Sequence, residues 1–239
     1  MFQNRYKELR SGWAIALSIA AIFTAVMPLI LVLSVMAAAS IDWGGLAAAE
    51  PAALTEAVTG EINGVLASPW INYGMYILQI GGLLGLFCLL YKRPLSHMGL
   101  HPKGWLKHLL FGGLFGIVSI GLAVAALAVT GAAEIGAPDW SALADSRWIH
   151  GFFVFVMVGF FEEILSRGFM MTALKTTRKT WLIVSLPAVI FGLLHAVNPN
   201  VTAFSLLNIM LVGILFAYLF IKTGRLWAPI GYHITWNFF

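Results

Sequence analysis

Six apolar segments in this chain are each long enough to cross a lipid bilayer, and a seventh begins near its last residues. A helix needs about 17 to 25 residues to span the roughly 30 Å of hydrocarbon. The segments cover 13–39, 71–91, 108–130, 148–175, 180–197 and 201–221, and the seventh starts at Leu226. Hydrophobic residues make up 60% of the chain and charged residues only 10%, unlike soluble domains. Since lipid requires each span to satisfy its own backbone hydrogen bonds, the sequence predicts an all-α, polytopic helical bundle of about seven spans.

The basic residues sort to one side of these spans. Every lysine and arginine except Arg147 and Arg167 lies before the first span or at the junctions that follow the second, fourth and sixth. The alternate loops are acidic. By the positive-inside rule the N-terminus is expected in the cytoplasm. The net charge of +4 then reflects topology and contact with anionic membrane lipids, and gives no reason to expect a nucleic-acid partner.

The last segment is short. Residues 226–239 number 14, which as a helix reach about 21 Å, too little to cross. We therefore expect either a natural chain that continues past Phe239, with an eighth span, or an end held within the bundle. No internal repeat or dividing linker is evident, so one membrane domain is predicted over 1–239, with N-terminal spans and loops in 1–147 and a catalytic core in 148–239. Residues 40–70 should form the largest external loop.

Three charged side chains interrupt the fourth apolar segment: Glu162, Glu163 and Arg167. A charge at the centre of a membrane helix costs roughly 2.5 to 3.5 kcal/mol, so the three together cost about 7 to 10 kcal/mol. That cost rivals the whole stability of a typical domain, about 5 to 15 kcal/mol. The cluster is therefore the first candidate for a functional site.

Further polar groups fall at a similar depth in the later spans. At 1.5 Å per helical residue, Glu162 lies about 20 Å from the cytoplasmic end of its span, His195 about 22 Å and Asn237 about 18 Å from theirs. His233 is shallower, at about 12 Å. Within ordinary helix tilt these groups occupy one layer of the membrane. We expect them to face one another.

The spacing of these residues indicates separate roles. Glu163 and Arg167 are four residues apart in the order that favours a helical ion pair, which lowers the cost of burying both; we call them the supporting pair. Glu162 is then free to act as a general base on water, with His195 holding that water or passing a proton to a leaving amine. His233 and Asn237 share a helical face and can donate hydrogen bonds to a developing oxyanion.

Other hydrolase chemistries fit the sequence less well. The HExxH pattern of zinc proteases and the Gly-x-Ser-x-Gly elbow are both absent. All three aspartates lie in the predicted external loops, so no buried aspartyl dyad can form. Cys88 is the only cysteine, which excludes an internal disulfide and leaves a catalytic thiol without an obvious partner.

Three ordered motifs resemble those of the CAAX protease and bacteriocin-processing (CPBP, or Abi) family. EEILSRG, at 162–168, resembles the family's EExxxR motif. FGLLH, at 191–195, resembles FxxxH, and HITWN, at 233–237, resembles HxxxN. The order and spacing match as well, and the resemblance covers roughly 148–239.

The resemblance implies an intramembrane endopeptidase similar to the type II CAAX prenyl proteases, which remove the last three residues of isoprenylated CAAX proteins. On that likeness Glu162 and His195 would activate water, His233 and Asn237 would form an oxyanion hole, and the supporting pair would hold them in place. The expected partners are membrane lipids and a prenylated or membrane-embedded protein or peptide. The expected location is multi-pass in a prokaryotic plasma membrane.

Three alternatives stay open. A zinc-dependent version of the same protease would use Glu162, His195 and His233 as ligands, although a glutamate mechanism without a cofactor is preferred because so few ligands are present. A non-catalytic immunity or scaffolding protein could keep the same fold. A transporter could use the acidic cluster as a proton relay, but the inverted repeats common in transporters are not seen.

Overall fold

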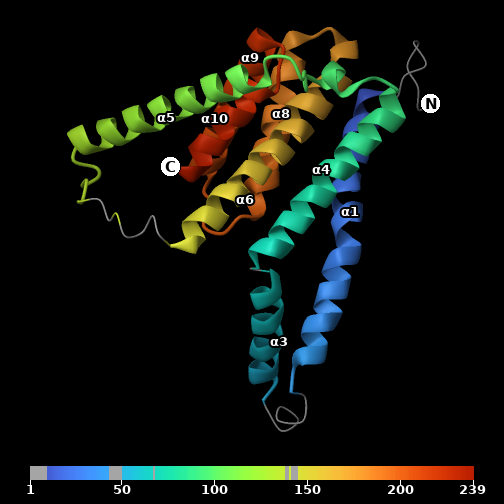
Figure 1. Ribbon diagram of the computed structural model, residues 1–239, viewed down its shortest axis with the longest axis vertical. Coiled ribbons are helices and arrows are strands. Elements are labelled where there is room, and N and C mark those ends of the chain that lie inside the picture. The colour runs from blue at the N-terminus through green and yellow to red at the C-terminus, as the bar shows by residue number, and fades with distance from the viewer. Residues whose placement is uncertain (1–9, 43–49, 67, 138–139, 141–144) are drawn as a thin grey trace.

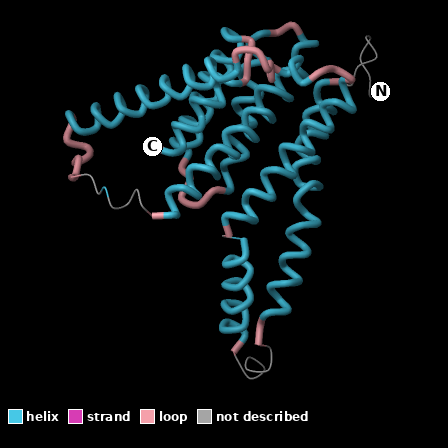
Figure 2. The backbone as a smooth tube through the Cα atoms, viewed as in Figure 1, coloured by secondary structure: helices cyan, strands magenta, loops and turns pink. Residues whose placement is uncertain are grey.

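The computed structural model describes residues 10–42, 50–66, 68–137, 140 and 145–239. Within these ranges every regular element is a helix, and none is a strand (Figure 2). The predicted all-α class is confirmed.

The long helices follow the predicted spans closely. In chain order they are α1 (Ser11–Ser40), α4 (Pro69–Tyr91), α5 (Trp105–Val129), α6 (Ser146–Glu163), α8 (Thr180–Leu194) and α9 (Ala203–Thr223). The shorter pieces are α3 (Pro51–Leu66), η1 (Leu95–Met98), η3 (Ile164–Met170), α7 (Met171–Leu174), η4 (Lys175–Thr177), η5 (His195–Val197) and α10 (Trp227–Phe238). Over the described ranges, six helical stretches are long and apolar enough to cross a membrane, one for each complete predicted span.

The seventh predicted segment forms α10, a helix of 12 residues. It packs mainly against α5 and also against α6 and α9. Seven consecutive residues, from Ala228 to Ile234, are buried. The helix therefore sits inside the bundle, although it is shorter than a span.

The predicted external loop 40–70 contains a helix that was not expected, α3. Pro51 occupies its first position, where a missing N–H costs nothing, and alanine, leucine and glutamate follow. It runs beside the far half of α1, away from the basic end of the bundle (Figure 1). Good helix formers thus override the Ala/Gly-rich, loop-like appearance of this stretch.

Helices α5 and α10 approach so closely that their backbones touch through glycines. A Cβ atom on Gly112 would lie 1.9 Å from the carbonyl oxygen of Ala228, and one on Gly231 would lie 2.0 Å from that of Leu109. Small residues permit such close approach between membrane helices, where packing replaces the hydrophobic effect as the driving force. This contact fixes the helix that carries His233.

The start of α10 is tied to the loop between α4 and α5. The N–H of Leu226 donates to the carbonyl of Gly99 at 3.0 Å, and the indole of Trp227 donates to the carbonyl of His101 at 2.7 Å. Gly99 has φ +105, and a Cβ there would lie 2.5 Å from the ring of Phe220. A glycine is therefore required at this crossing.

The fourth span changes its winding directly after the two glutamates. From Ile164 to Met170 it is a π-helix, and all seven of its residues are buried. Such a wide turn is rare and is found frequently at functional sites. It packs against α1, α4, α8 and α9, so the charged part of the span lies at the centre of the bundle.

Candidate active site

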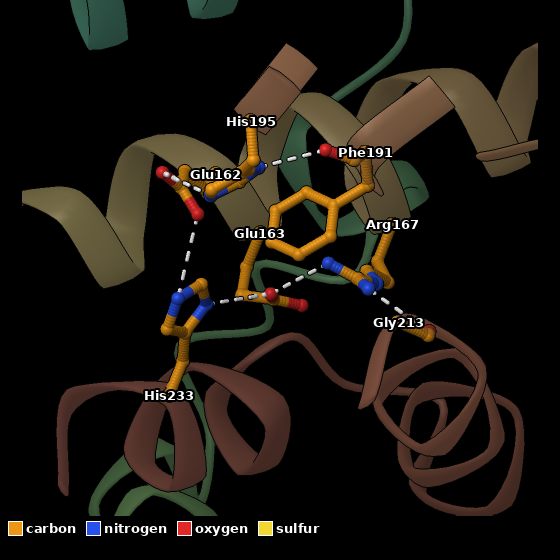
Figure 3. Close-up of polar contacts among 7 residues, drawn as sticks. All are labelled: Glu162, Glu163, Arg167, Phe191, His195, Gly213 and His233. Carbon is orange, nitrogen blue, oxygen red and sulfur yellow. Dashed lines mark hydrogen bonds and ion pairs between the residues drawn. The ribbon is translucent and has the colours of Figure 1, made fainter. Parts of the chain in front are cut away.

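The supporting pair, Glu163 and Arg167, is fully enclosed. Nη1 of Arg167 lies 2.7 Å from Oε1 of Glu163, and the side chains are 1% and 0% exposed. Nη2 of Arg167 donates to the carbonyl of Gly213 on α9 at 2.9 Å (Figure 3). The guanidinium also lies between the rings of Phe191 and Phe216, 4.8 and 5.1 Å from their centroids. Hydrogen bonds and cation–π contacts together offset the loss of hydration.

His233 lies between the two adjacent carboxylates. Its Nδ1 is 2.9 Å from Oε1 of Glu163, and its Nε2 is 3.4 Å from Oε2 of Glu162 (Figure 3). Because a carboxylate is an acceptor, Nδ1 carries a proton toward Glu163. In the neutral ring Nε2 then carries a lone pair and can only accept a hydrogen bond. In the charged ring Nε2 carries a proton and is a second donor.

His195 approaches Glu162 from the other side. Its Nε2 lies 3.9 Å from Oε1 of Glu162, and its Nδ1 lies 2.8 Å from the carbonyl oxygen of Phe191 (Figure 3). A carbonyl can only accept, so Nδ1 is the protonated nitrogen and Nε2 presents its lone pair toward Glu162. Each oxygen of Glu162 therefore faces the Nε2 atom of a different histidine.

These groups lie where two cavities meet. The larger, of about 340 Å³, is lined by Glu162 and His195 together with residues of α1 and α4. The smaller, of about 180 Å³, is lined by His195, His233 and Asn237 and by residues of α9. The structure thus brings Glu162, His195 and His233 together and places Asn237 beside both histidines in the second cavity.

Several lining residues were given no role in the site by the sequence. Phe191 lies against both histidine rings, at centroid distances of 4.7 and 6.1 Å, and it lines both cavities. Ile19, Ile22 and Phe23 of α1 form part of the larger cavity. Phe191 begins the segment that resembles FxxxH, which is a signal for its position, whereas apolar residues in the apolar span of α1 carry no signal of such a role.

Two amides within the apolar spans also line these cavities. Gln79 of α4 lines the larger cavity, and its Oε1 is buried without a hydrogen-bond partner in the described structure. Asn208 of α9 lines the smaller one. An isolated amide in an apolar span is the signal that could have marked both positions.

Among the residues that the structure describes, no group of three or more histidine, cysteine or acidic side chains has the spacing of a metal site. Nδ1 of His233 is already bonded to Glu163, and Nδ1 of His195 to Phe191. Both bonds leave the Nε2 atom of each ring directed toward Glu162, and a second hydrogen bond of this kind also orients histidines that bind metals.

A comparison with protein families gives one match for this region. Residues 144–239 match the model described as type II CAAX prenyl endopeptidase Rce1-like. No curated protein and no solved structure matches the chain. The matched range contains the fourth span and every predicted site residue, and it excludes α1 and α4, which line the larger cavity. The match covers the same part of the chain as the three motifs and agrees with their resemblance: residues 144–239 of this integral membrane protein are similar to the Rce1-like type II CAAX prenyl endopeptidases, a family of proteases.

Proposed function

We propose that the protein is an intramembrane endopeptidase that cleaves a peptide bond of a prenylated CAAX-type or other membrane-bound substrate. The observation that carries this proposal is that the two oxygens of Glu162 each face the Nε2 atom of a separate histidine, at 3.9 Å and 3.4 Å, beside a cavity. A carboxylate base with two imidazoles beside it is a set of groups that can hydrolyse an amide by general acid–base catalysis.

In this mechanism Glu162 takes a proton from a water molecule that also hydrogen-bonds to His195. The lone pair on Nε2 of His195 orients the water, because Nδ1 of that ring is committed to the carbonyl of Phe191. The hydroxide equivalent forms a bond to the substrate carbonyl carbon. The C–N bond then breaks, the proton passes to the leaving amine, and the products are a carboxylate and an amine.

The oxyanion of the intermediate is stabilised by His233 and Asn237. Nδ1 of His233 is committed to Glu163, so only its doubly protonated ring can donate from Nε2 to the oxyanion. Glu163 supports that positive charge, and Arg167 in turn supports Glu163. The loss of one such oxyanion donor typically costs about 2.7 to 4 kcal/mol of transition-state stabilisation.

The larger cavity holds one side of the substrate. A peptide inside a membrane must find partners for its backbone N–H and C=O groups. The buried, unpaired Oε1 of Gln79 accepts a hydrogen bond from a substrate N–H, while the apolar side chains of α1 contact lipid or apolar parts of the substrate. Selectivity therefore arises partly from α1 and α4, outside the family-matched range.

The same site is compatible with the finer expectations drawn from the sequence. These are a location in a prokaryotic plasma membrane with a cytoplasmic N-terminus, and catalysis without a metal. A zinc-dependent version of the enzyme and a non-catalytic immunity or scaffolding protein are the alternatives. No observation on the described residues favours either.

The test is cleavage of a farnesylated CAAX peptide by the purified chain, with products identified by mass spectrometry. His195→Ala should reduce the rate at least a hundredfold if it orients the water. Ser119→Ala is the matched control, because Ser119 is partly exposed on α5, its hydroxyl bonds to the carbonyl of Phe115 on its own helix, and it lines neither cavity. Absence of cleavage by the wild-type chain would favour the non-catalytic alternative.

A further inference from the structure

A third cavity, of about 410 Å³, lies at the basic end of the bundle and shares no residue with the two at the candidate active site. It is formed where η1, the end of the fourth span, the start of α8 and the end of α9 meet. These ends gather on one side of the molecule, at the top of Figure 1. By the positive-inside rule this is the cytoplasmic surface.

The polar side of this cavity carries one cation, Lys175, and several hydrogen-bonding groups. Lys175, His97 and His101 line it together with the hydroxyls of Ser96 and Thr180, and no acidic residue is among the lining side chains. Lys175 holds its Nζ 5.8 Å from the ring centroid of Phe220, which keeps the charge at the cavity. A group with several acceptor oxygens and a negative charge fits this set of donors.

The N-terminus of α8 adds positive electrostatic potential at the same cavity. Thr180 is the first residue of this 15-residue helix, and the residue before it, Lys179, supplies no side-chain cap. The first N–H groups of a helix carry a partial positive charge and bind anions. The ammonium group of Lys175 and a helix N-terminus therefore meet at one cavity.

The other side of the cavity is apolar. Met171, Ile183, Phe220 and Ile221 line it, and Ile221 is half exposed on the outer surface of α9. A free anion would not contact these apolar side chains. A phospholipid would place its phosphate among the donors and an acyl chain along the wall, at the depth where headgroups lie.

We propose that this cavity binds the phosphate of an anionic phospholipid from the cytoplasmic leaflet. Lys175 supplies the fixed positive charge, and Ser96 and Thr180 supply neutral donors. Since Lys175 lies in the last turn of the helical stretch Ser146–Thr177, which also carries Glu162 and Glu163, the bound lipid braces the cytoplasmic end of the catalytic helix. This site is independent of the proposed protease activity.

The test measures thermal unfolding of the full chain in a neutral detergent by tryptophan fluorescence, with added phosphatidylglycerol, phosphatidylcholine or inorganic phosphate. Phosphatidylglycerol should raise the melting temperature more than phosphatidylcholine does. Lys175→Gln should raise about fivefold the phosphatidylglycerol concentration that gives half of this stabilisation, as expected for the loss of one interfacial charge. Lys175→Arg should keep it.

Lys179→Gln is the matched control, since Lys179 is exposed four residues further along and does not line the cavity. It should behave as the wild type. Equal effects of the two lipids on the wild type, or an unchanged lipid effect in Lys175→Gln, would overturn the proposal. Inorganic phosphate that protects as well as phosphatidylglycerol would overturn the assignment to a lipid.

Discussion

Nε2 of His233, on α10, lies 3.4 Å from Oε2 of Glu162, on the fourth span, while Nδ1 of the same ring bonds to the neighbouring Glu163. Two successive helical residues point about 100° apart, yet one imidazole contacts both because its two nitrogens face different directions. The ring therefore links the buried ion pair to the cavity. Its position depends on how α10 packs.

Arg167→Met should destabilise the fold by about 3 to 5 kcal/mol, because it leaves Glu163 charged and buried without its partner. The double variant Glu163→Gln/Arg167→Met should recover part of that loss, since it removes the uncompensated charge. Unfolding in mixed detergent and SDS micelles measures both. If Arg167→Met alone were as stable as the wild type, the pair would not be the structural support described.

Gly112→Ala should destabilise the contact between α5 and α10 by about 1 to 3 kcal/mol, or by more, because its methyl group would overlap the carbonyl of Ala228. Cleavage should fall as well, since α10 carries His233. Gly121→Ala on the same helix is the control, because nothing lies within 4 Å of its added methyl. Equal melting temperatures for the two variants would contradict the close approach of these helices.

Gln79→Leu should raise the KM for the peptide about two- to tenfold with little change in kcat, as expected for the loss of one neutral hydrogen bond to the substrate. Asn72→Leu on the same helix is the control, because the Asn72 amide bonds to the carbonyl of Ser68 and does not line the cavity. The measurement is steady-state kinetics. Equal KM values for both variants would remove Gln79 from the substrate site.

Incubation with a metal chelator should leave the cleavage rate unchanged within a factor of about two. The reason is that the proposed mechanism takes its base from Glu162 and its oxyanion donors from His233 and Asn237. The test compares the cleavage rate of the protein before and after dialysis against the chelator. Loss of activity that added zinc restores would establish the zinc alternative.

Much of this architecture could be predicted because the membrane restricts it. Hydrocarbon thickness sets the length of each span, so the predicted segment 71–91 became Pro69–Tyr91 and 201–221 became Ala203–Thr223. The pairing of Glu163 with Arg167 follows from helical spacing alone. Both results depend on local geometry.

The remaining features depend on tertiary packing, which the sequence does not display. The bond between Glu163 and His233 requires the glycine contact between α5 and α10 to place the ring. The presence of Gln79 and Glu162 in the lining of one cavity depends on how α4 packs against α6. Helix α3 was missed because its composition resembled a loop.

The central claim is that Glu162 is the general base, and the most direct test is the single-turnover cleavage rate of a farnesylated CAAX peptide by Glu162→Gln. The substitution keeps the shape of the side chain and removes its ability to take a proton. The account predicts a rate about 10² to 10⁴ times lower than that of the wild type, with the melting temperature nearly unchanged. A rate within a few-fold of the wild type would contradict it.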